Sequence, residues 1–311
     1  MIKFTLLRLF FIVVFTLPGT ATNAETVKLF EIPIKTIDGT VFKLSDFKGR
    51  KPVYLKYWAS WCQPCRKQMP HLQHTFEKYG DDIEVIAVNI SMNDTADAIK
   101  QTIDEFNLSL PVVIDENSRL SQAFNLLATP YHILLDINGN VVHKGHDVSV
   151  ELNNKIRLLS KQKAVNLPEV ELEWSTASPL NLNLDKNSIS LLFFSSTWCD
   201  WYLKDSRPDM SANCINAQKQ TNKLHEQYPQ FNWQGVLTRL WTGNKELKEY
   251  QKKYKIKYSM AIDETNSAFL TYKVKRFPAL IAIKNGKEIF RLSDFSDPTL
   301  LNDGLKKLKN M

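Results

Sequence analysis

The chain has 311 residues, 43% of them apolar and 23% charged, which is enough for two globular domains that each bury a core. This composition excludes a disordered, a collagen-like and a disulfide-scaffold protein. The net charge of +7 is spread along the chain, so nucleic acid is not an expected partner.

The first 24 residues have the layout of a secretory signal peptide. Lys3 and Arg8 precede an apolar run over residues 9–17, and small residues lead to Ala24, after which we expect cleavage. An uncleaved anchor is the alternative, but the run is shorter than the roughly 18 residues that span a bilayer. We therefore expect an exported protein that is periplasmic or otherwise extracytoplasmic.

The rest of the chain contains the same pattern twice. An apolar, β-rich run ends in Trp61-Cys62 and again in Trp198-Cys199, and each is followed by a helix-compatible stretch. Later in each copy, Pro130 and Pro278 precede a strand, an Asn-Gly turn, a second strand and a helix. The expected ranges are 131–136, 141–144 and 151–163 in the first copy, and 279–284, 288–292 and 299–310 in the second.

The second copy is longer between its cysteine and its proline, which places an insertion in an irregular stretch over residues 204–214. Together these patterns predict an α/β protein of two tandem domains, over residues 25–163 and 164–311. Each domain should have a central mixed β-sheet flanked by helices.

The first pair of cysteines, Cys62 and Cys65, encloses only two residues. So tight a loop restrains the unfolded chain little, which favours redox exchange or metal binding over a structural role. Cys62 follows a strand and should lie where a helix begins, where free N–H groups and the helix dipole lower a thiol pKa below about 8.5. We therefore expect Cys62 to be an exposed, unusually acidic nucleophile and Cys65 to be the less exposed, resolving thiol.

The run WASWCQPC over residues 58–65, taken with Pro70 and Thr129-Pro130, resembles the thioredoxin superfamily. Residues 37–49 look like the N-terminal hairpin of its exported TlpA/ResA-like branch, so the resemblance covers about residues 27–160. It implies thioredoxin-like domains, of which the second is degenerate, and a thiol–disulfide oxidoreductase that reduces protein disulfides. It also implies a cis proline at Pro130 that faces the cysteine pair.

The resemblance also implies the roles of other residues. Thr129 and Pro130 would border the substrate groove, and Trp61 would shield the cysteine pair. No nucleotide fingerprint such as GxGxxG occurs, so we expect no cofactor. The implied partners are protein disulfide substrates and a membrane electron donor of the DsbD type.

Two positions depart from the family pattern. Thioredoxins have an acidic residue in the strand where this chain has Lys56, and TlpA/ResA-like reductases often have glutamate where this chain has Gln68. If Lys56 points inward, it tunes the cysteine pKa by favouring the thiolate, and if it snorkels outward it has no effect. Both orientations remain open.

In the second copy Tyr202 takes the place of the resolving cysteine. Cys214 is then the remaining partner for Cys199, and Arg207-Pro208 should break the helix between them so that the chain can fold back. We favour a structural Cys199–Cys214 disulfide, with a slower redox relay to Cys62 and Cys65 as the alternative. The aromatic residues of this stretch form either a partner-binding patch or part of the core, and they are Trp198, Trp201 and Tyr202.

Several rival functions make different demands on the sequence. A structural zinc site needs four ligands, and no second CxxC accompanies Cys62 and Cys65, so we expect no metal and place His71 and His74 on the surface. A peroxidase would need an isolated cysteine. Net oxidation or isomerisation of disulfides uses the same two cysteines and stays possible. The alternative of a different class is a scaffold whose second domain recruits a client.

Overall fold

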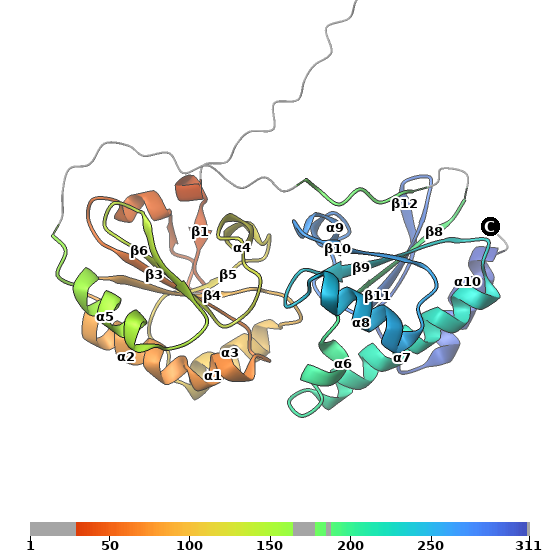
Figure 1. Ribbon diagram of the computed structural model, residues 1–311, viewed down its shortest axis with the longest axis horizontal. Helices are drawn as coiled ribbons and strands as arrows, with labels where there is room; N and C mark the ends of the chain where they lie inside the picture. Colours follow the sequence, from red (N-terminus) through yellow and green to blue (C-terminus); the bar gives the residue numbers. More distant parts are fainter. Residues whose placement is uncertain (1–28, 164–177, 185–187, 310–311) are drawn as a thin grey trace, which may run out of the picture.

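The computed structural model describes residues 29–163, 178–184 and 188–309, and we call the first range the first half and the other two the second half. The halves lie side by side, and each is built on a five-stranded sheet (Figure 1). The strand orders, β5-β4-β3-β6-β7 and β10-β9-β8-β11-β12, are equivalent. In both sheets the middle strand pairs parallel with one neighbour and antiparallel with the other. The predicted α/β fold with two mixed sheets is confirmed.

After the short strands β1 and β2 of the first half, helices and strands follow the same succession in the two halves. The strands of the first half are β1 (Ile34–Lys35), β2 (Val41–Phe42), β3 (Val53–Trp58), β4 (Glu84–Asn89), β5 (Val112–Ile114), β6 (Tyr131–Leu135) and β7 (Val141–Gly145). Its helices are α1 (Gln63–Lys67), α2 (Met69–Tyr79), α3 (Ala96–Glu105), α4 (Arg119–Ala123) and α5 (Val150–Leu159), with 3-10 turns at Leu29–Glu31 and Leu44–Phe47.

The second half contains β8 (Ser190–Ser195), β9 (Asn232–Thr238), β10 (Ser259–Asp263), β11 (Ala279–Lys284) and β12 (Lys287–Leu292). Its helices are α6 (Cys199–Tyr202), α7 (Pro208–Gln227), α8 (Asn244–Tyr254), α9 (Ser267–Thr271) and α10 (Pro298–Lys309). No helix within these described ranges combines the length and apolar character needed to cross a membrane. The expected signal peptide and the expected boundary at residue 164 lie outside the described residues.

The middle strands are the centre of each core. Every residue of β3 and of β8 is buried. A strand that is covered on both faces needs a continuous apolar run rather than an alternating one, and both sequences supply it. Lys56 is the exception in β3, and its burial requires polar partners inside the protein.

The expected hairpins after the two prolines are present. β6 pairs antiparallel with β7, and β11 with β12. Each turn contains a glycine with positive φ, Gly139 at 86° and Gly286 at 71°, a conformation that costs other residues energy. The Asn-Gly signal in the sequence therefore predicted these turns correctly.

The helices after the two Trp-Cys pairs are interrupted at different points. In the first half the break falls at Gln68, and Pro70 lies in the first turn of α2. In the second half α6 ends at Tyr202 and α7 starts at Pro208. The irregular stretch predicted over residues 204–214 is therefore shorter than expected, because a proline at the first helical position starts α7 there.

Candidate active site

Cys62 is the N-cap residue of α1. The chain leaves the central strand β3 at Trp58 and reaches this helix within a few residues. The backbone N–H of Cys65 donates to Cys62 Sγ at 3.3 Å, and the two cysteines form a disulfide. A sulfur held at a helix start by a backbone N–H is stabilised as a thiolate once the disulfide is reduced. This position favours a thiolate at Cys62.

The expected exposure of Cys62 is wrong. Cys62 and Cys65 are both 0% exposed, and only Gln63 and Pro64 between them reach the surface. Trp61 is also buried, and the rings around it belong to the second half. Its centroid lies 5.0 Å from that of Trp198, 6.2 Å from that of Tyr202 and 5.9 Å from that of Trp241. The sequence around Cys62 contains no sign of this cover because the covering residues lie in distant parts of the chain.

The Thr129–Pro130 loop reaches the same end of the sheet. β6 begins directly after Pro130 and runs antiparallel to β3, with Tyr131 opposite Tyr57. The peptide bond before Pro130 is cis, as expected. Thr129 is 2% exposed and its Oγ1 has no hydrogen-bond partner, while the carbonyl of Pro130 is 2.7 Å from Nδ1 of His146. The sheet therefore delivers Cys62 and Pro130 to one edge.

Lys56 points inward and is fully buried. Its Nζ donates to Oε1 of Gln68 at 2.8 Å, and the same oxygen lies 2.9 Å from Nε2 of His132. The other ring nitrogen, Nδ1, lies 2.7 Å from the hydroxyl of Tyr54. Because Gln68 Oε1 can only accept, His132 donates from Nε2, and its Nδ1 accepts a hydrogen bond from the Tyr54 hydroxyl. The four side chains form one hydrogen-bonded chain between β3, β6 and the break that precedes α2.

The electrostatics of this chain follow from its burial. Desolvation lowers the pKa of Lys56 to about 7. It also lowers the pKa of His132 to about 2, and the positive charge of Lys56 is the second cause of that decrease. Desolvation also raises the pKa of Tyr54. Within the described part of the chain, no carboxylate hydrogen-bonds to these groups. Lys56 is therefore the member of this chain that changes its charge near neutral pH.

Sequence reasoning found Lys56 and Gln68 but missed His132 and Tyr54. A usable signal exists, because one histidine interrupts the apolar run Tyr131–Leu135, and one lysine interrupts Val53–Trp58. Lys56 and His132 lie opposite each other in the register of the two strands. Only this pairing shows that the two interruptions meet.

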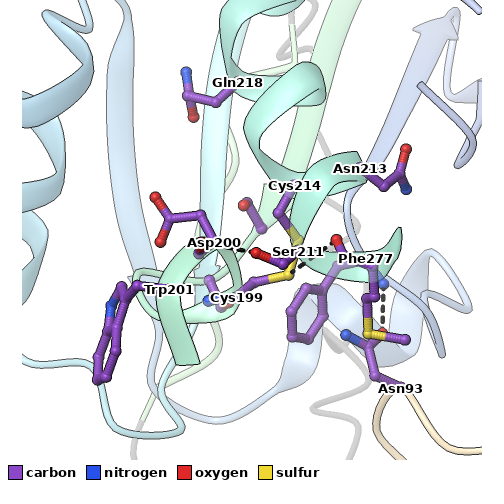
Figure 2. The surroundings of a disulfide bond; sticks show 12 residues. Asn93, Cys199, Asp200, Trp201, Ser211, Asn213, Cys214, Gln218 and Phe277 are labelled. Carbon is purple, nitrogen blue, oxygen red and sulfur yellow. Dashed lines mark hydrogen bonds between the residues drawn. A yellow bond between two sulfur atoms is a disulfide. The ribbon is translucent and has the colours of Figure 1, made fainter. Parts of the chain in front are cut away.

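A disulfide joins Cys199 to Cys214 in the second half and links α6 to α7 (Figure 2). Cys199 is 0% and Cys214 2% exposed. Asn93 of the first half reaches this region, where its Oδ1 accepts the backbone N–H of Phe277 at 2.8 Å. The helix break expected before Pro208 is what lets the two cysteines meet.

The aromatic residues beside Cys199 do not form one surface. Trp198 is 1% exposed and belongs to the core, whereas Trp201 is 60% exposed. Tyr202 is partly buried, and desolvation raises the pKa of its hydroxyl. The structure thus separates residues that the sequence places side by side.

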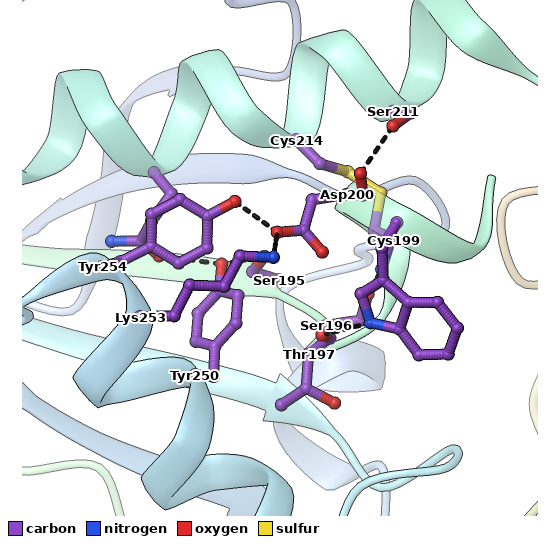
Figure 3. A network of polar contacts seen from close by, with 12 residues as sticks. Ser195, Ser196, Thr197, Cys199, Asp200, Ser211, Cys214, Tyr250, Lys253 and Tyr254 are labelled. Atoms are coloured by element: carbon purple, nitrogen blue, oxygen red, sulfur yellow. Dashed lines mark hydrogen bonds and ion pairs between the residues drawn. A yellow bond between two sulfur atoms is a disulfide. The ribbon is translucent and has the colours of Figure 1, made fainter. Parts of the chain in front are cut away.

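Asp200 is a second buried charge next to Cys199 (Figure 3). Its Oδ2 accepts hydrogen bonds from the Tyr254 hydroxyl and from Lys253 Nζ, the latter at 2.6 Å. Its backbone carbonyl accepts the hydroxyl of Ser211 at 2.8 Å. These bonds hold α6, α7 and α8 together. In the described residues no group of three His, Cys, Asp or Glu side chains is arranged to hold a metal ion.

Part of the chain is similar to known proteins. The Redoxin family matches residues 21–156. Thiol-disulfide oxidoreductase ResA of Bacillus thuringiensis subsp. konkukian is 31% identical over 130 residues, which are 41% of this chain and 73% of ResA. Thioredoxin-like protein YneN of Bacillus subtilis is 30% identical over 131 residues, 41% of this chain and 76% of YneN. The crystal structure of StoA from Bacillus subtilis aligns at 24% identity with 40% of this chain and 95% of its own, with a TM-score of 0.36.

Proposed function

Since this chain belongs to the family of ResA thiol–disulfide oxidoreductases, we propose that it reduces protein disulfides outside the cytoplasm through Cys62 and Cys65. The observation that carries the proposal is the position of Cys62 Sγ at the start of α1, where it accepts the N–H of Cys65. A thiol in this place reacts as the thiolate, which is the form that attacks disulfides.

The proposed reaction has two exchange steps. The Cys62 thiolate attacks one sulfur of the substrate disulfide, that disulfide breaks, and the other substrate sulfur leaves as a thiolate that takes up a proton. Cys65, once deprotonated, then attacks Cys62 Sγ and releases the second substrate thiol. Two electrons pass from the cysteine pair to the substrate, and the Cys62–Cys65 disulfide remains.

Three neighbours of the pair have proposed roles. Thr129 and Pro130 border the groove for the substrate chain, and the buried Thr129 Oγ1 has no hydrogen-bond partner within the protein. Trp61 shields the disulfide from water. Lys56 tunes the cysteines, because its ammonium form favours the thiolate and its pKa of about 7 makes this effect stronger below neutral pH.

The pairing of the cysteines supports the proposed location outside the cytoplasm. All four cysteines are paired in disulfides, which persist outside the cytoplasm. The signal-peptide pattern over residues 1–24 points the same way. A disulfide left on Cys62–Cys65 after each cycle needs a reductant, and a membrane donor of the DsbD type is the proposed source.

The second half is proposed to be a degenerate thioredoxin-like domain over residues 164–311. It shares the strand order of the first half, the Trp-Cys pair after the middle strand and a cis proline at Pro278. Tyr202 replaces the resolving cysteine, so the Cys199–Cys214 disulfide is proposed to be structural. Exchange chemistry then belongs to residues 25–163.

The test is insulin reduction with dithiothreitol as the electron source. Cys62→Ser should abolish the acceleration given by the wild-type protein, and the Cys199→Ser/Cys214→Ser double variant should keep it. If Cys62→Ser retains biological activity but no reductase activity, the protein acts as a client-binding scaffold. The reduction potential of the pair decides the direction, because about −270 mV is typical of a reductant and about −120 mV of an oxidant.

A further inference from the structure

The two halves contact each other through residues at equivalent positions, and one such contact occurs twice. The backbone N–H of Asn93 donates to the carbonyl of Lys275 at 3.0 Å, and the N–H of Trp241 donates to the carbonyl of Leu127 at 2.7 Å. Asn93 and Trp241 both have a φ of 52°. Asn93 lies between β4 and α3, and Trp241 lies at the equivalent place between β9 and α8. Lys275 and Leu127 hold the same position before their cis prolines.

Two further contacts each join a residue of the first half to its own counterpart in the second half. Trp61 stacks on Trp198 with an interplanar angle of 28°. Ser118 and Asn266, the N-cap residues of α4 and α9, are joined by a 2.9 Å hydrogen bond. Equivalent residues that contact each other are the signature of an isologous interface, as in a twofold dimer. The two halves therefore associate like two subunits of a dimer within one chain.

The face that each half uses is the one that carries its Trp-Cys pair. On the first half, Arg207 Nη2 donates to Ser60 Oγ at 2.9 Å, and Trp198 covers Trp61. The ring of Tyr202 also lies against Trp61, with the two ring centroids 6.2 Å apart. Ser60 and Trp61, the two residues directly before Cys62, are thus covered by the second half, whereas Gln63 directly after it is exposed.

This cover is incompatible with the exchange step. Attack on a disulfide brings the nucleophilic sulfur against a sulfur of another protein, and Cys62 is 0% exposed. The Leu127 carbonyl, two residues before Thr129, already accepts the backbone N–H of Trp241. Resting on the proposed function, we infer that the second half occupies the catalytic face as a built-in partner that a client must displace before Cys62 reacts.

Two cavities interrupt the packing between the halves. Both cavities include Ser118 and Asn266 in their lining. The first half contributes Ile90 and Met92 to each, and the second half contributes Leu270 to one and Leu240 to the other. Contacts between units of one chain that resemble a subunit interface permit relative motion. The observed rate then scales with the fraction of open molecules, so exchange is slower than for an uncovered pair.

The test locks the halves with a bond that reductants do not break. In a Ser118→Cys/Asn266→Cys variant, the short thiol cross-linker dibromobimane is applied while the Cys62–Cys65 disulfide is intact. The matched control is the same variant labelled with monobromobimane, which cannot bridge. Two rates are measured on the full chain, reduction of the Cys62–Cys65 disulfide by the small phosphine TCEP and reduction of insulin.

The cross-linked protein should be at least about tenfold slower than the control in both assays, because its competent fraction falls. A second variant, Arg207→Ala, removes a contact of the closed state and should react faster with TCEP than the wild type. Equal rates for cross-linked and control protein would overturn the inference. If no form reduces insulin but the lock still slows TCEP, the inference stands and the proposed reductase function fails.

Discussion

Replacing Lys56 by methionine should stabilise the oxidised protein. The side chain is fully buried, and methionine fills a similar volume without a charge. Gln68 Oε1 keeps the donor from His132, so the substitution leaves no new buried acceptor without a partner. The gain comes from removing the desolvation penalty of the ammonium group.

The size of this gain follows from the pKa. Burial moves the pKa of Lys56 from 10.5 to about 7, and at about 1.36 kcal/mol per pH unit the full penalty is about 5 kcal/mol. The unfolded chain holds one more proton than the folded chain between these two values, so wild-type stability rises with pH there. The advantage of Lys56→Met should therefore fall from about 4–5 kcal/mol near about pH 6.5 to about 1–2 kcal/mol near about pH 9.5.

Urea unfolding of both proteins at the two pH values measures this difference. Lys67→Met is a matched control, because Lys67 is exposed on α1, and it should change the free energy of unfolding by less than about 0.5 kcal/mol at either pH. An advantage of Lys56→Met that does not shrink with rising pH, or a less stable variant, would refute the assignment of Lys56 as a desolvated amine.

Other consequences of the structure are open to direct measurement. The Cys199→Ser/Cys214→Ser variant should lose about 3 kcal/mol of stability in denaturant, as expected for a disulfide with a sequence separation of 15, and loss of insulin reduction would instead favour the redox relay. His132 should show no imidazole titration by NMR from about pH 4 to about pH 8, since burial lowers its pKa to about 2, and a titration near its usual value would contradict the buried network. Asp200→Asn weakens the bond from Lys253 and should cost about 1–3 kcal/mol in thermal unfolding, whereas an unchanged midpoint would mean that the buried carboxylate is not paired.

Local patterns were sufficient for the fold and for the cysteine pair. The apolar runs before Trp61 and Trp198, the Asn-Gly turns and the Trp-Cys repeat act over short distances, so each could be recognised without knowing the rest of the chain. The break before Pro208 belongs to the same group, since proline cannot continue a helix.

Tertiary contacts decided what the sequence could not. The orientation of Lys56 depended on Gln68 and His132, which come from a helix junction and a neighbouring strand. The cover over Trp61, directly before Cys62, comes from Trp198 and Trp241 in the second half. No periodicity or motif near Cys62 encodes such a contact, so the sequence did not predict it.

The most direct test of the account is to trap the first intermediate. With Cys65→Ser the resolving step is missing, so incubation with a disulfide substrate should leave a stable mixed disulfide. Mass spectrometry of the digested adduct should find the substrate attached to Cys62. An adduct on Cys199 or Cys214, or no adduct from a protein whose wild type reduces insulin, would contradict Cys62 as the nucleophile.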